Sequence, residues 1–340
     1  MKEEVLKTFQ EIATHLKIIS PFQINLQEQN IQASTMSAEN RSMYLLKDVI
    51  YQAFYAQDMA TYLASLNATT ITHDPAVKQQ FIEQLSAQNH SANGWDMGWL
   101  VHSVNPNGQV YGQKQEQLRL LEPGKFRLVD SSQPLQPRSE VQILKEREIK
   151  DVQGAFYYVN GNALLAQTPH IVRLYWNITP EGAPLLIHLL TQHLNLYKVP
   201  FQFKCLNTPA LYTRKDSAVL YIQKRHLKIT LGLLEDIIHE MEPYLQTPPP
   251  LYTRVLYPGL SFAESPLVQT SFGMHRSQLV AEGLWNAYIA GKQSIEENVQ
   301  SIIDIWHHHQ VSLEQPYLNP MSQFPYSFTF EPTATYESKS

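Results

Sequence analysis

The sequence predicts an α+β protein, in which a largely antiparallel sheet has helices packed on one side and is joined to a mainly helical N-terminal region. Three observations lead to this prediction. Apolar Val5, Phe9 and Ile12 recur at helical spacing within residues 2–18. Short strand-like runs separated by turn residues follow from residue 100 onward. Two of these runs, 173–178 and 201–204, have one apolar and one polar face, which is typical of an antiparallel sheet covered on one side.

Helix-like segments occur along the whole chain. The expected helices cover residues 2–18, part of 38–65 beginning at Ser37, 75–88, 179–196, 226–244, 275–291 and 295–309. Thr179, Pro180 and Glu181 form a strong helix start, because threonine can cap, proline suits the first helical position and an acid suits the first turn. Three prolines at 248–250 end the helix before them.

The expected strands are short. Residues 105–108 (NPNG) are a turn signal, so residues 100–111 are expected to form a hairpin. The other expected strands cover residues 117–121, 126–129, 141–144, 154–159, 171–178, 201–206 and 218–222. Residues 131–139 (SSQPLQPRS) contain two prolines and little apolar surface, so they are the best candidate for a linker.

The chain of 340 residues is long enough for a sizeable core and for more than one domain. We expect an N-terminal helical and β region over 1–150 that recognises a peptide or a partner. A catalytic domain is expected over 151–330 and a disordered tail over 331–340.

Composition narrows the class of protein. The net charge of −5 gives no global basic field, so we expect no nucleic-acid partner. The sequence has no apolar run long enough to span a membrane and no apolar stretch near its start that suggests a secretory signal. Cys205 is the single cysteine, which rules out an internal disulfide and a multi-cysteine zinc site. We therefore expect a soluble cytoplasmic protein.

Positive charge is concentrated in residues 198–225. This window has a net charge of +5 inside an acidic chain, because it contains six basic residues against Asp216. Such a concentration favours an anion site. A solvated basic face is the alternative explanation.

Strand periodicity places several polar side chains together. In residues 173–178, Arg173, Tyr175 and Asn177 share one face, and in residues 201–204 Gln202 and Lys204 do. If the two strands belong to one sheet, these side chains could form the floor of an anion-binding cleft. They could equally be the solvent-facing residues of an ordinary half-exposed sheet.

Long ordered runs in this region resemble a known family. Residues 172–222 (VRLYWNITPEGAP…AVLYI), 256–284 (LYPGLSFAESP…VAEGL) and 156–163 (FYYVNGNA) are similar to the HopA-type effector family. Related proteins act as stand-alone lyases of class V lanthipeptide synthetases, and the family is distantly similar to the OspF/SpvC phosphothreonine lyases. The resemblance implies a phospho-Ser/phospho-Thr lyase that leaves dehydroalanine or dehydrobutyrine by β-elimination, with no metal and no cofactor.

The resemblance also implies roles for individual residues. Lys204 matches the base that takes the α-proton, and Arg214 and Arg276 match phosphate-binding arginines. Arg173 is a third predicted phosphate ligand. It lies on a strand that corresponds to the Lys-x-His strand of the related lyases, but here the pattern is Arg-x-Tyr. The general acid is therefore Tyr175, His275 or absent.

Three further side chains are predicted to bind substrate, namely Asn177, Gln202 and Tyr221, although Tyr221 could simply be a packing residue. A lysine with an ordinary pKa of about 10.4 is a poor base at neutral pH. Nearby arginines and partial burial are therefore expected to lower the pKa of Lys204.

Two other functions remain open. The basic cleft could bind a phosphopeptide or a leader peptide without turning it over. The protein could also be a translocated effector that acts on a host protein. For the lyase, the implied partners are a phosphorylated precursor peptide, a Ser/Thr kinase that supplies it and a cyclase.

Overall fold

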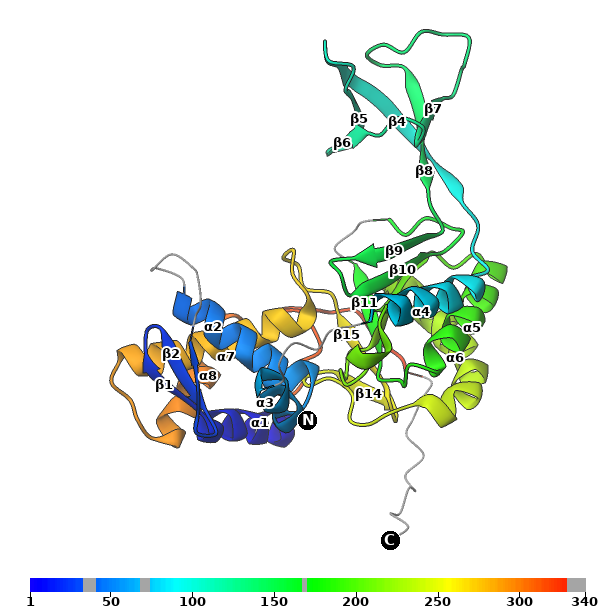
Figure 1. Ribbon diagram of the computed structural model, residues 1–340. Coiled ribbons are helices and arrows are strands. Elements are labelled where there is room, and N and C mark those ends of the chain that lie inside the picture. Colours follow the sequence, from blue (N-terminus) through cyan, green and yellow to red (C-terminus); the bar gives the residue numbers. More distant parts are fainter. Residues whose placement is uncertain (33–40, 68–73, 167–169, 329–340) are drawn as a thin grey trace.

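The computed structural model describes residues 1–32, 41–67, 74–166 and 170–328. It confirms the predicted α+β class, because helices and large sheets share the chain and every strand pairing in the sheets is antiparallel. Ser37 and the tail at 331–340 lie outside the described residues. The chain forms three parts: a helical lobe, a central sheet with its own helices, and an arm that projects from the sheet (Figure 1).

The central sheet has seven strands and carries the candidate site. Its order is β14 (Arg254–Tyr257), β15 (Leu260–Glu264), β11 (Ile171–Trp176), β13 (Ala218–Gln223), β12 (Phe201–Leu206), β10 (Phe156–Asn160) and β9 (Glu148–Val152). The predicted strands β10 to β13 are present, whereas β9, β14 and β15 were not predicted. Short 3-10 turns lie between these elements at Pro209–Leu211, Lys224–His226 and Glu242–Tyr244.

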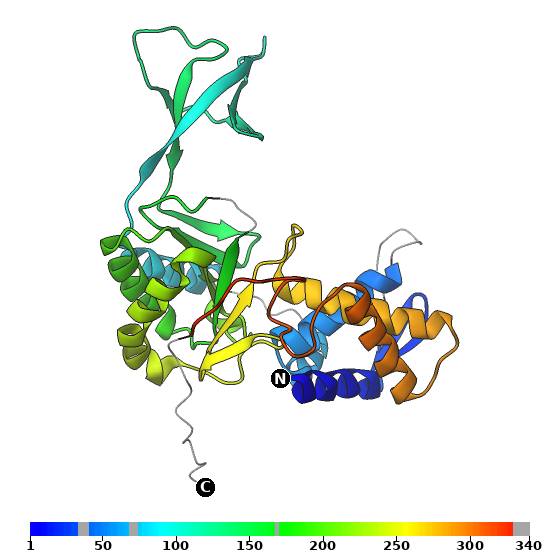
Figure 2. The ribbon, with the colours of Figure 1, turned by 180° about the vertical axis from the view of Figure 1, so that it is seen from behind.

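Helices cover the apolar face of this sheet. Helices α5 (Gly182–Leu196) and α6 (Leu227–Met241) lie behind it, and α4 (Pro75–Ala87) contacts α5 and β9 (Figures 1 and 2). The alternation of β11 explains this arrangement, since Leu174 and Trp176 are buried in the core while Arg173 is only half-buried.

The predicted start of α5 is wrong by two residues. Thr179 does not cap the helix, which begins at Gly182 after Glu181. The backbone N–H of Thr179 instead donates to the carbonyl of Tyr244, which holds this threonine before the helix.

The helical lobe combines both ends of the chain. Helices α7 (Phe272–Ile289) and α8 (Ile295–His308) pack with the N-terminal elements (Figure 2). Those elements are α1 (Lys2–His15), β1 (Leu16–Ser20), β2 (Gln23–Leu26), β3 (Gln29–Gln32), α2 (Arg41–Ile50), the π-helix Tyr51–Ala56 and α3 (Met59–Asn67). The lobe therefore draws on residues from both sides of position 150, and a domain division at that position stays a prediction.

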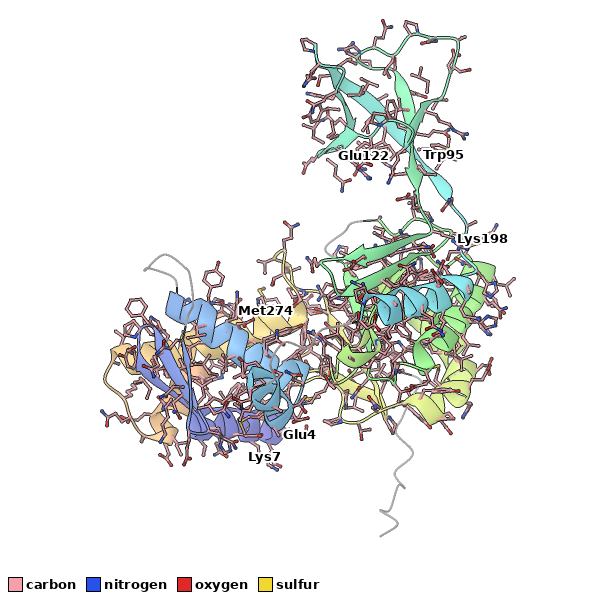
Figure 3. All side chains as sticks on the ribbon, viewed as in Figure 1. Glu4, Lys7, Trp95, Glu122, Lys198 and Met274 are labelled. Atoms are coloured by element: carbon pink, nitrogen blue, oxygen red, sulfur yellow. The ribbon has the colours of Figure 1, made fainter. Side chains whose placement is uncertain are left out.

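Helix α1 is amphipathic as predicted but ends at His15, because Leu16 is extended and begins an unpredicted three-stranded sheet. Its charged Glu4 and Lys7 are exposed on the outer side of the lobe (Figure 3), whereas Phe9 and Ile12 are fully buried. Among the described residues, no helix has the length and apolar character that crossing a membrane requires.

The arm is a separate five-stranded sheet with the order β6 (Gln117–Leu121), β5 (Val110–Lys114), β4 (Gly94–Val104), β8 (Glu140–Lys145) and β7 (Phe126–Leu128). It has a small core of its own, which includes Trp99, Val101 and Val141. The predicted hairpin is confirmed as β4 and β5. Residues 131–139, which were expected to be a linker, instead lie in the loop that joins β7 to β8 within the arm.

Candidate functional site

The strand register places the predicted polar residues on one face of the central sheet. Strand β13 lies between β11 and β12, so the two predicted polar strands do belong to one sheet. Arg173 lies opposite Tyr221, and Tyr221 lies opposite Gln202. Gln202 in turn lies opposite Asn160, to which its side-chain amide donates a hydrogen bond of 3.0 Å. These four residues form a row across four strands.

A second row lies two residues further along the same strands and therefore on the same face. Tyr175 is opposite Val219, Val219 is opposite Lys204, and Lys204 is opposite Tyr158. We call the two rows together the polar face. Adjacent strands are about 4.8 Å apart, so the rows place a lysine, an arginine and three tyrosines within reach of one bound residue.

Lys204 is held among aromatic rings. Its ammonium lies 4.2 Å from the centroid of the Phe156 ring. Burial lowers the pKa of Lys204, but the negative charges that Tyr221, Tyr158 and Asp216 can carry outweigh burial and raise that pKa above its ordinary value of 10.5. The expectation of a lowered pKa is therefore wrong for the free protein, where Lys204 is an ammonium at neutral pH. The cause is that tyrosines, not arginines, surround it.

Arg173 and Tyr175 form the other end of the polar face. The Arg173 guanidinium donates hydrogen bonds to the Ser265 hydroxyl at 2.9 Å and to the Thr270 carbonyl at 3.1 Å, and it lies over the Tyr221 ring. Burial raises the pKa of the Tyr175 hydroxyl, although Arg173 opposes the shift. Tyr175 therefore keeps its proton at neutral pH.

Arg214 is held by an ion pair beside the polar face. Its guanidinium donates to both carboxylate oxygens of Asp216, at 2.9 and 3.0 Å, and to the Tyr51 hydroxyl at 2.7 Å. Asp216 in turn accepts a hydrogen bond from Tyr51. Tyr51 belongs to the π-helix, a distortion that is frequent at functional sites. The ion pair orients Arg214 without using all of its N–H donors.

The helical lobe also holds the loop between β12 and β13, which carries Arg214 and Lys215. The carbonyl of Ala56, at the end of the π-helix, accepts a hydrogen bond from the backbone N–H of Lys215, and the carbonyl of Phe54 accepts one from the Lys215 ammonium. Lys215 therefore serves as an anchor. Lys224 is likewise paired with Glu264, so several cations of the basic segment 198–225 are neutralised by local partners. Lys204 is the basic residue of this segment that lies on the polar face.

Arg276 lies near enough to Tyr55 and Tyr175 for their charges to act on its guanidinium, and its predicted role as a phosphate ligand stays a prediction. The side chain is fully buried, and its guanidinium donates to the carbonyls of Pro316 at 2.9 Å and Leu318 at 2.8 Å. Burial lowers the pKa of Arg276 to about 10. These hydrogen bonds connect helix α7, which carries Arg276, to the C-terminal segment that contains Pro316 and Leu318.

His275 is placed with Arg276 and not with Lys204. Its Nδ1 lies 2.7 Å from the Arg276 guanidinium, and the His309 imidazole is also near it. Burial, with help from those two groups, lowers the pKa of His275 to about 4. The imidazole is therefore neutral at physiological pH, which makes His275 a poor general acid and leaves Tyr175 as the better of the two predicted candidates.

Of the three residues predicted to contact substrate, two lie on the polar face. Gln202 and Tyr221 are half-buried members of the first row. Asn177 is buried beyond the end of β11, and its amide donates to the Pro248 carbonyl at 2.8 Å. Asn177 therefore holds the loop after α6, and its predicted contact with a substrate stays a prediction.

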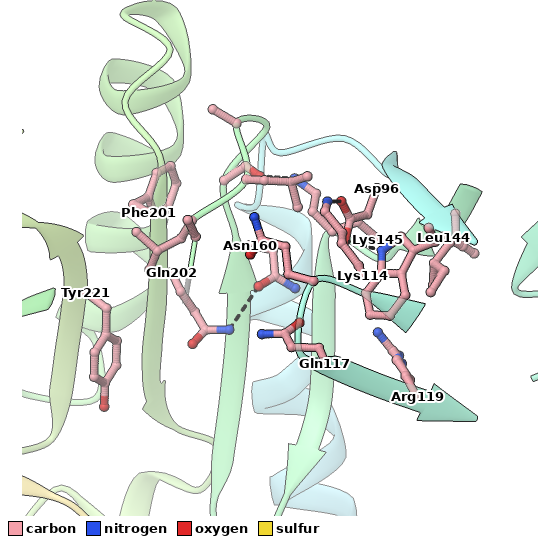
Figure 4. A pocket seen from close by; sticks show the side chains of 18 of the residues that line it. Asp96, Lys114, Gln117, Arg119, Leu144, Lys145, Asn160, Phe201, Gln202 and Tyr221 are labelled. Atoms are coloured by element: carbon pink, nitrogen blue, oxygen red, sulfur yellow. Dashed lines mark hydrogen bonds and ion pairs between the residues drawn. The ribbon is translucent and has the colours of Figure 1, made fainter. Parts of the chain in front are cut away.

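The polar face opens at one end into a cavity of about 930 Å³ between the central sheet and the arm (Figure 4). Gln202, Tyr221 and Asn160 line its sheet side, and Gln117 and Arg119 of β6 line the arm side. The volume is within the range of small-molecule and peptide-side-chain pockets. A bound molecule could thus contact the arm and the polar face at the same time.

Some residues of the site were not predicted. Tyr158 and Asn160 follow the same strand alternation as Phe156, so the period of two in FYYVN could have revealed them. Tyr51 and Tyr55 approach from the π-helix, and no local pattern signals contacts with Arg214 and Tyr175, which are far away along the chain.

Comparison with known proteins identifies the family. The sequence profile of the HopA1 effector protein family matches residues 148–318, which is half of the chain and includes every predicted site residue. The chain therefore belongs to the HopA1 effector protein family, and the resemblance noted in the sequence is confirmed at that level. A search of curated proteins finds no match.

Two solved structures are similar to this chain. One is the effector protein from Pseudomonas syringae pv. tomato strain DC3000, at 16% identity and a TM-score of 0.49, covering 94% of this chain and 98% of that one. The other is the effector protein from Pseudomonas syringae pv. syringae strain 61, at 15% identity and a TM-score of 0.45, covering 94% and 99%.

Proposed function

We propose that the protein is a phospho-Ser/phospho-Thr lyase that removes phosphate from a peptide by β-elimination. The observation that carries the proposal is the polar face, where Lys204 shares two adjacent rows with Arg173, Tyr175 and Tyr221, and where Tyr221 also lines the cavity. A base, a phosphate-binding cation and a proton donor on one rigid sheet are the groups that this reaction requires.

The reaction needs few groups from the protein. Lys204 takes the α-proton of the phosphorylated residue, and the electron pair of that C–H bond forms the Cα=Cβ double bond. The Cβ–O bond then breaks and phosphate leaves with the bonding electrons. Arg173 and the free N–H groups of Arg214 neutralise the phosphate charge as it grows, because guanidinium groups bind phosphate bidentately. Tyr175 supplies a proton to the leaving oxygen.

Lys204 must lose its proton before it can act as a base. Burial is the largest single influence on its pKa, and a bound peptide would exclude further water and strengthen that lowering effect. In the free protein the neighbouring charges outweigh burial, so the reaction depends on the small fraction of molecules in which Lys204 is a neutral amine, and that fraction grows with pH.

A second candidate function is binding of a phosphopeptide without turnover. The raised pKa of Lys204 favours it, because an ammonium beside Arg173 is an anion-binding group and not a base. The two candidates differ in whether the peptide changes mass.

The biological setting of the lyase is part of the proposal. Dehydroalanine and dehydrobutyrine are intermediates of lanthipeptide-type maturation, in which a Ser/Thr kinase supplies the phosphorylated precursor peptide and a cyclase consumes the product. Membership of an effector family makes a host phosphoprotein the alternative substrate. A neighbouring precursor-peptide gene and kinase gene would favour the first setting, and a secretion chaperone gene the second.

The test is the intact mass of a phosphothreonine peptide incubated with the protein. Elimination removes phosphoric acid, about 98 Da, whereas hydrolysis removes the phosphoryl group alone, about 80 Da. Lys204→Arg is the sharpest variant, because arginine keeps the positive charge that binds phosphate but does not act as a base. We expect it to bind the phosphopeptide and to leave its mass unchanged. Elimination by Lys204→Arg at the wild-type rate would contradict the assignment.

A further inference from the structure

Strand β6 lies at an edge of the arm sheet, directly beside the candidate site. Within the described residues β5 is the strand that β6 pairs with, so residues 118–121 present the outer side of their backbone to the surroundings. An edge strand leaves alternate N–H and C=O groups without a strand partner, and an extended peptide can pair with them. Leu118 and Leu120 are 58% and 43% exposed, which leaves apolar contact area along the same strand.

The cavity beside β6 carries positive charge. Its charged lining residues are Asp96, Lys114, Arg119 and Lys145, which give a net charge of +2. Asp96 is already paired with Lys114 at 2.6 Å. The Lys145 ammonium donates to the carbonyls of Gly161 and Asn162, which ties the arm to the central sheet. An acidic segment is the occupant that this charge complements, and Arg119 is the exposed cation best placed to meet it.

The same cavity continues onto the polar face. Gln117 and Arg119 of β6 lie across from Gln202 and Tyr221 (Figure 4). Gln202 is two residues before Lys204 on one strand, a separation of about 7 Å. An extended peptide advances about 3.3 Å per residue, so a chain that pairs with β6 would reach Lys204 within a few residues.

We propose that β6 and Arg119 bind an extended acidic segment of the peptide substrate, a few residues from the phosphorylated residue that Lys204 acts on. The proposal rests on the function proposed above and names what the substrate contains besides phosphate. The backbone of β6 supplies affinity by strand addition, and Arg119 supplies the preference for acidic side chains. The arm therefore holds the substrate, while the central sheet carries out the reaction.

The test uses the full chain and two labelled phosphothreonine peptides that differ only in whether glutamates or glutamines flank the phosphothreonine. Fluorescence anisotropy gives the Kd of each. We expect wild type to prefer the glutamate peptide, and Arg119→Glu to reduce that preference about tenfold. Arg138→Glu is the matched control, because Arg138 is exposed on the same arm but lies outside this cavity, and it should leave the preference unchanged. An equal effect of the two variants would overturn the proposal.

Hydrogen exchange tests the strand addition independently of any variant. The amides of residues 118–120 should exchange more slowly once the glutamate peptide binds, and protection elsewhere without protection of β6 would overturn strand addition. Failure of the lyase proposal is distinguishable from failure of this one. Binding through Arg119 without any loss of peptide mass would remove the lyase and leave the arm site standing. If the rate of elimination changed neither with Arg119→Glu nor with the flanking glutamates, the lyase proposal would stand and the arm site would be refuted.

Discussion

The rate of elimination should depend steeply on pH, and the size of this dependence follows from the surroundings of Lys204. Neighbouring negative charges raise the pKa of Lys204 above its ordinary value in the free protein, so the neutral amine is a small minority at neutral pH. Each pH unit then multiplies the reactive fraction tenfold. Between about pH 7 and pH 9 we therefore expect kcat/KM to rise about a hundredfold.

Affinity should behave differently over the same range. The phosphate is already close to fully ionised, and Arg173 and Lys204 both stay charged, so the Kd for the phosphopeptide should change little. Initial rates come from the mass of the peptide at short times, and the Kd comes from anisotropy on Lys204→Arg, which binds without reacting. A pH-independent kcat/KM would refute Lys204 as the base.

Three further predictions concern the surroundings of the site. Arg276→Leu leaves two buried carbonyls without a donor, so we expect a loss of about 2–5 kcal/mol in the free energy of unfolding, measured by urea denaturation. Hydrogen bonds and the Lys224 ammonium hold the pKa of Glu264 below its ordinary value of 4.5 against the effect of burial, so wild type should lose stability as pH falls through that range, and Glu264→Gln should not. Gly273→Ala places a Cβ 2.3 Å from the Tyr55 ring, so we expect about 1–3 kcal/mol of destabilisation and an altered near-ultraviolet circular dichroism spectrum.

Each of these has an outcome that contradicts it. Wild-type urea stability in Arg276→Leu would show that the C-terminal segment is held by other contacts. The sign for Glu264 follows from its lowered pKa, because the stabilisation is present above the ordinary pKa and is lost as the carboxylate is protonated. If wild type and Glu264→Gln lost stability equally as the pH falls, protonation of Glu264 would not be the cause of the acid sensitivity. A stable Gly273→Ala would mean that Tyr55 can move without cost.

Much of the fold could be predicted because its signals are local. The alternation in β11 and β12 separates a polar face from an apolar one, and the helices and the β4–β5 hairpin follow from periodicity and turn residues. Strands β14 and β15 were not predicted, although their residues lie within the resemblance. Leu260–Glu264 is buried along its whole length, so it has no alternation to recognise.

The site could be predicted only where residues share a strand or a pair of strands. Arg173, Tyr175, Gln202 and Lys204 come together as the alternation implies. Arg276 could not be judged from sequence, because whether it meets a ligand or backbone carbonyls depends on where residues 316–318 return. The pKa of Lys204 was predicted in the wrong direction for the same reason: its neighbours come from strands that the sequence does not order.

The most direct measurement uses a phosphoserine peptide with deuterium at the α-carbon, incubated with the wild-type protein and weighed intact. Abstraction of the α-proton predicts a loss of about 99 Da from this peptide against about 98 Da from the unlabelled one, with a slower rate for the deuterated peptide if C–H cleavage limits the reaction. Loss of about 80 Da from both peptides, with deuterium retained, would show hydrolysis and contradict the account. An unchanged mass for both would also contradict it and leave phosphopeptide binding as the function of the polar face.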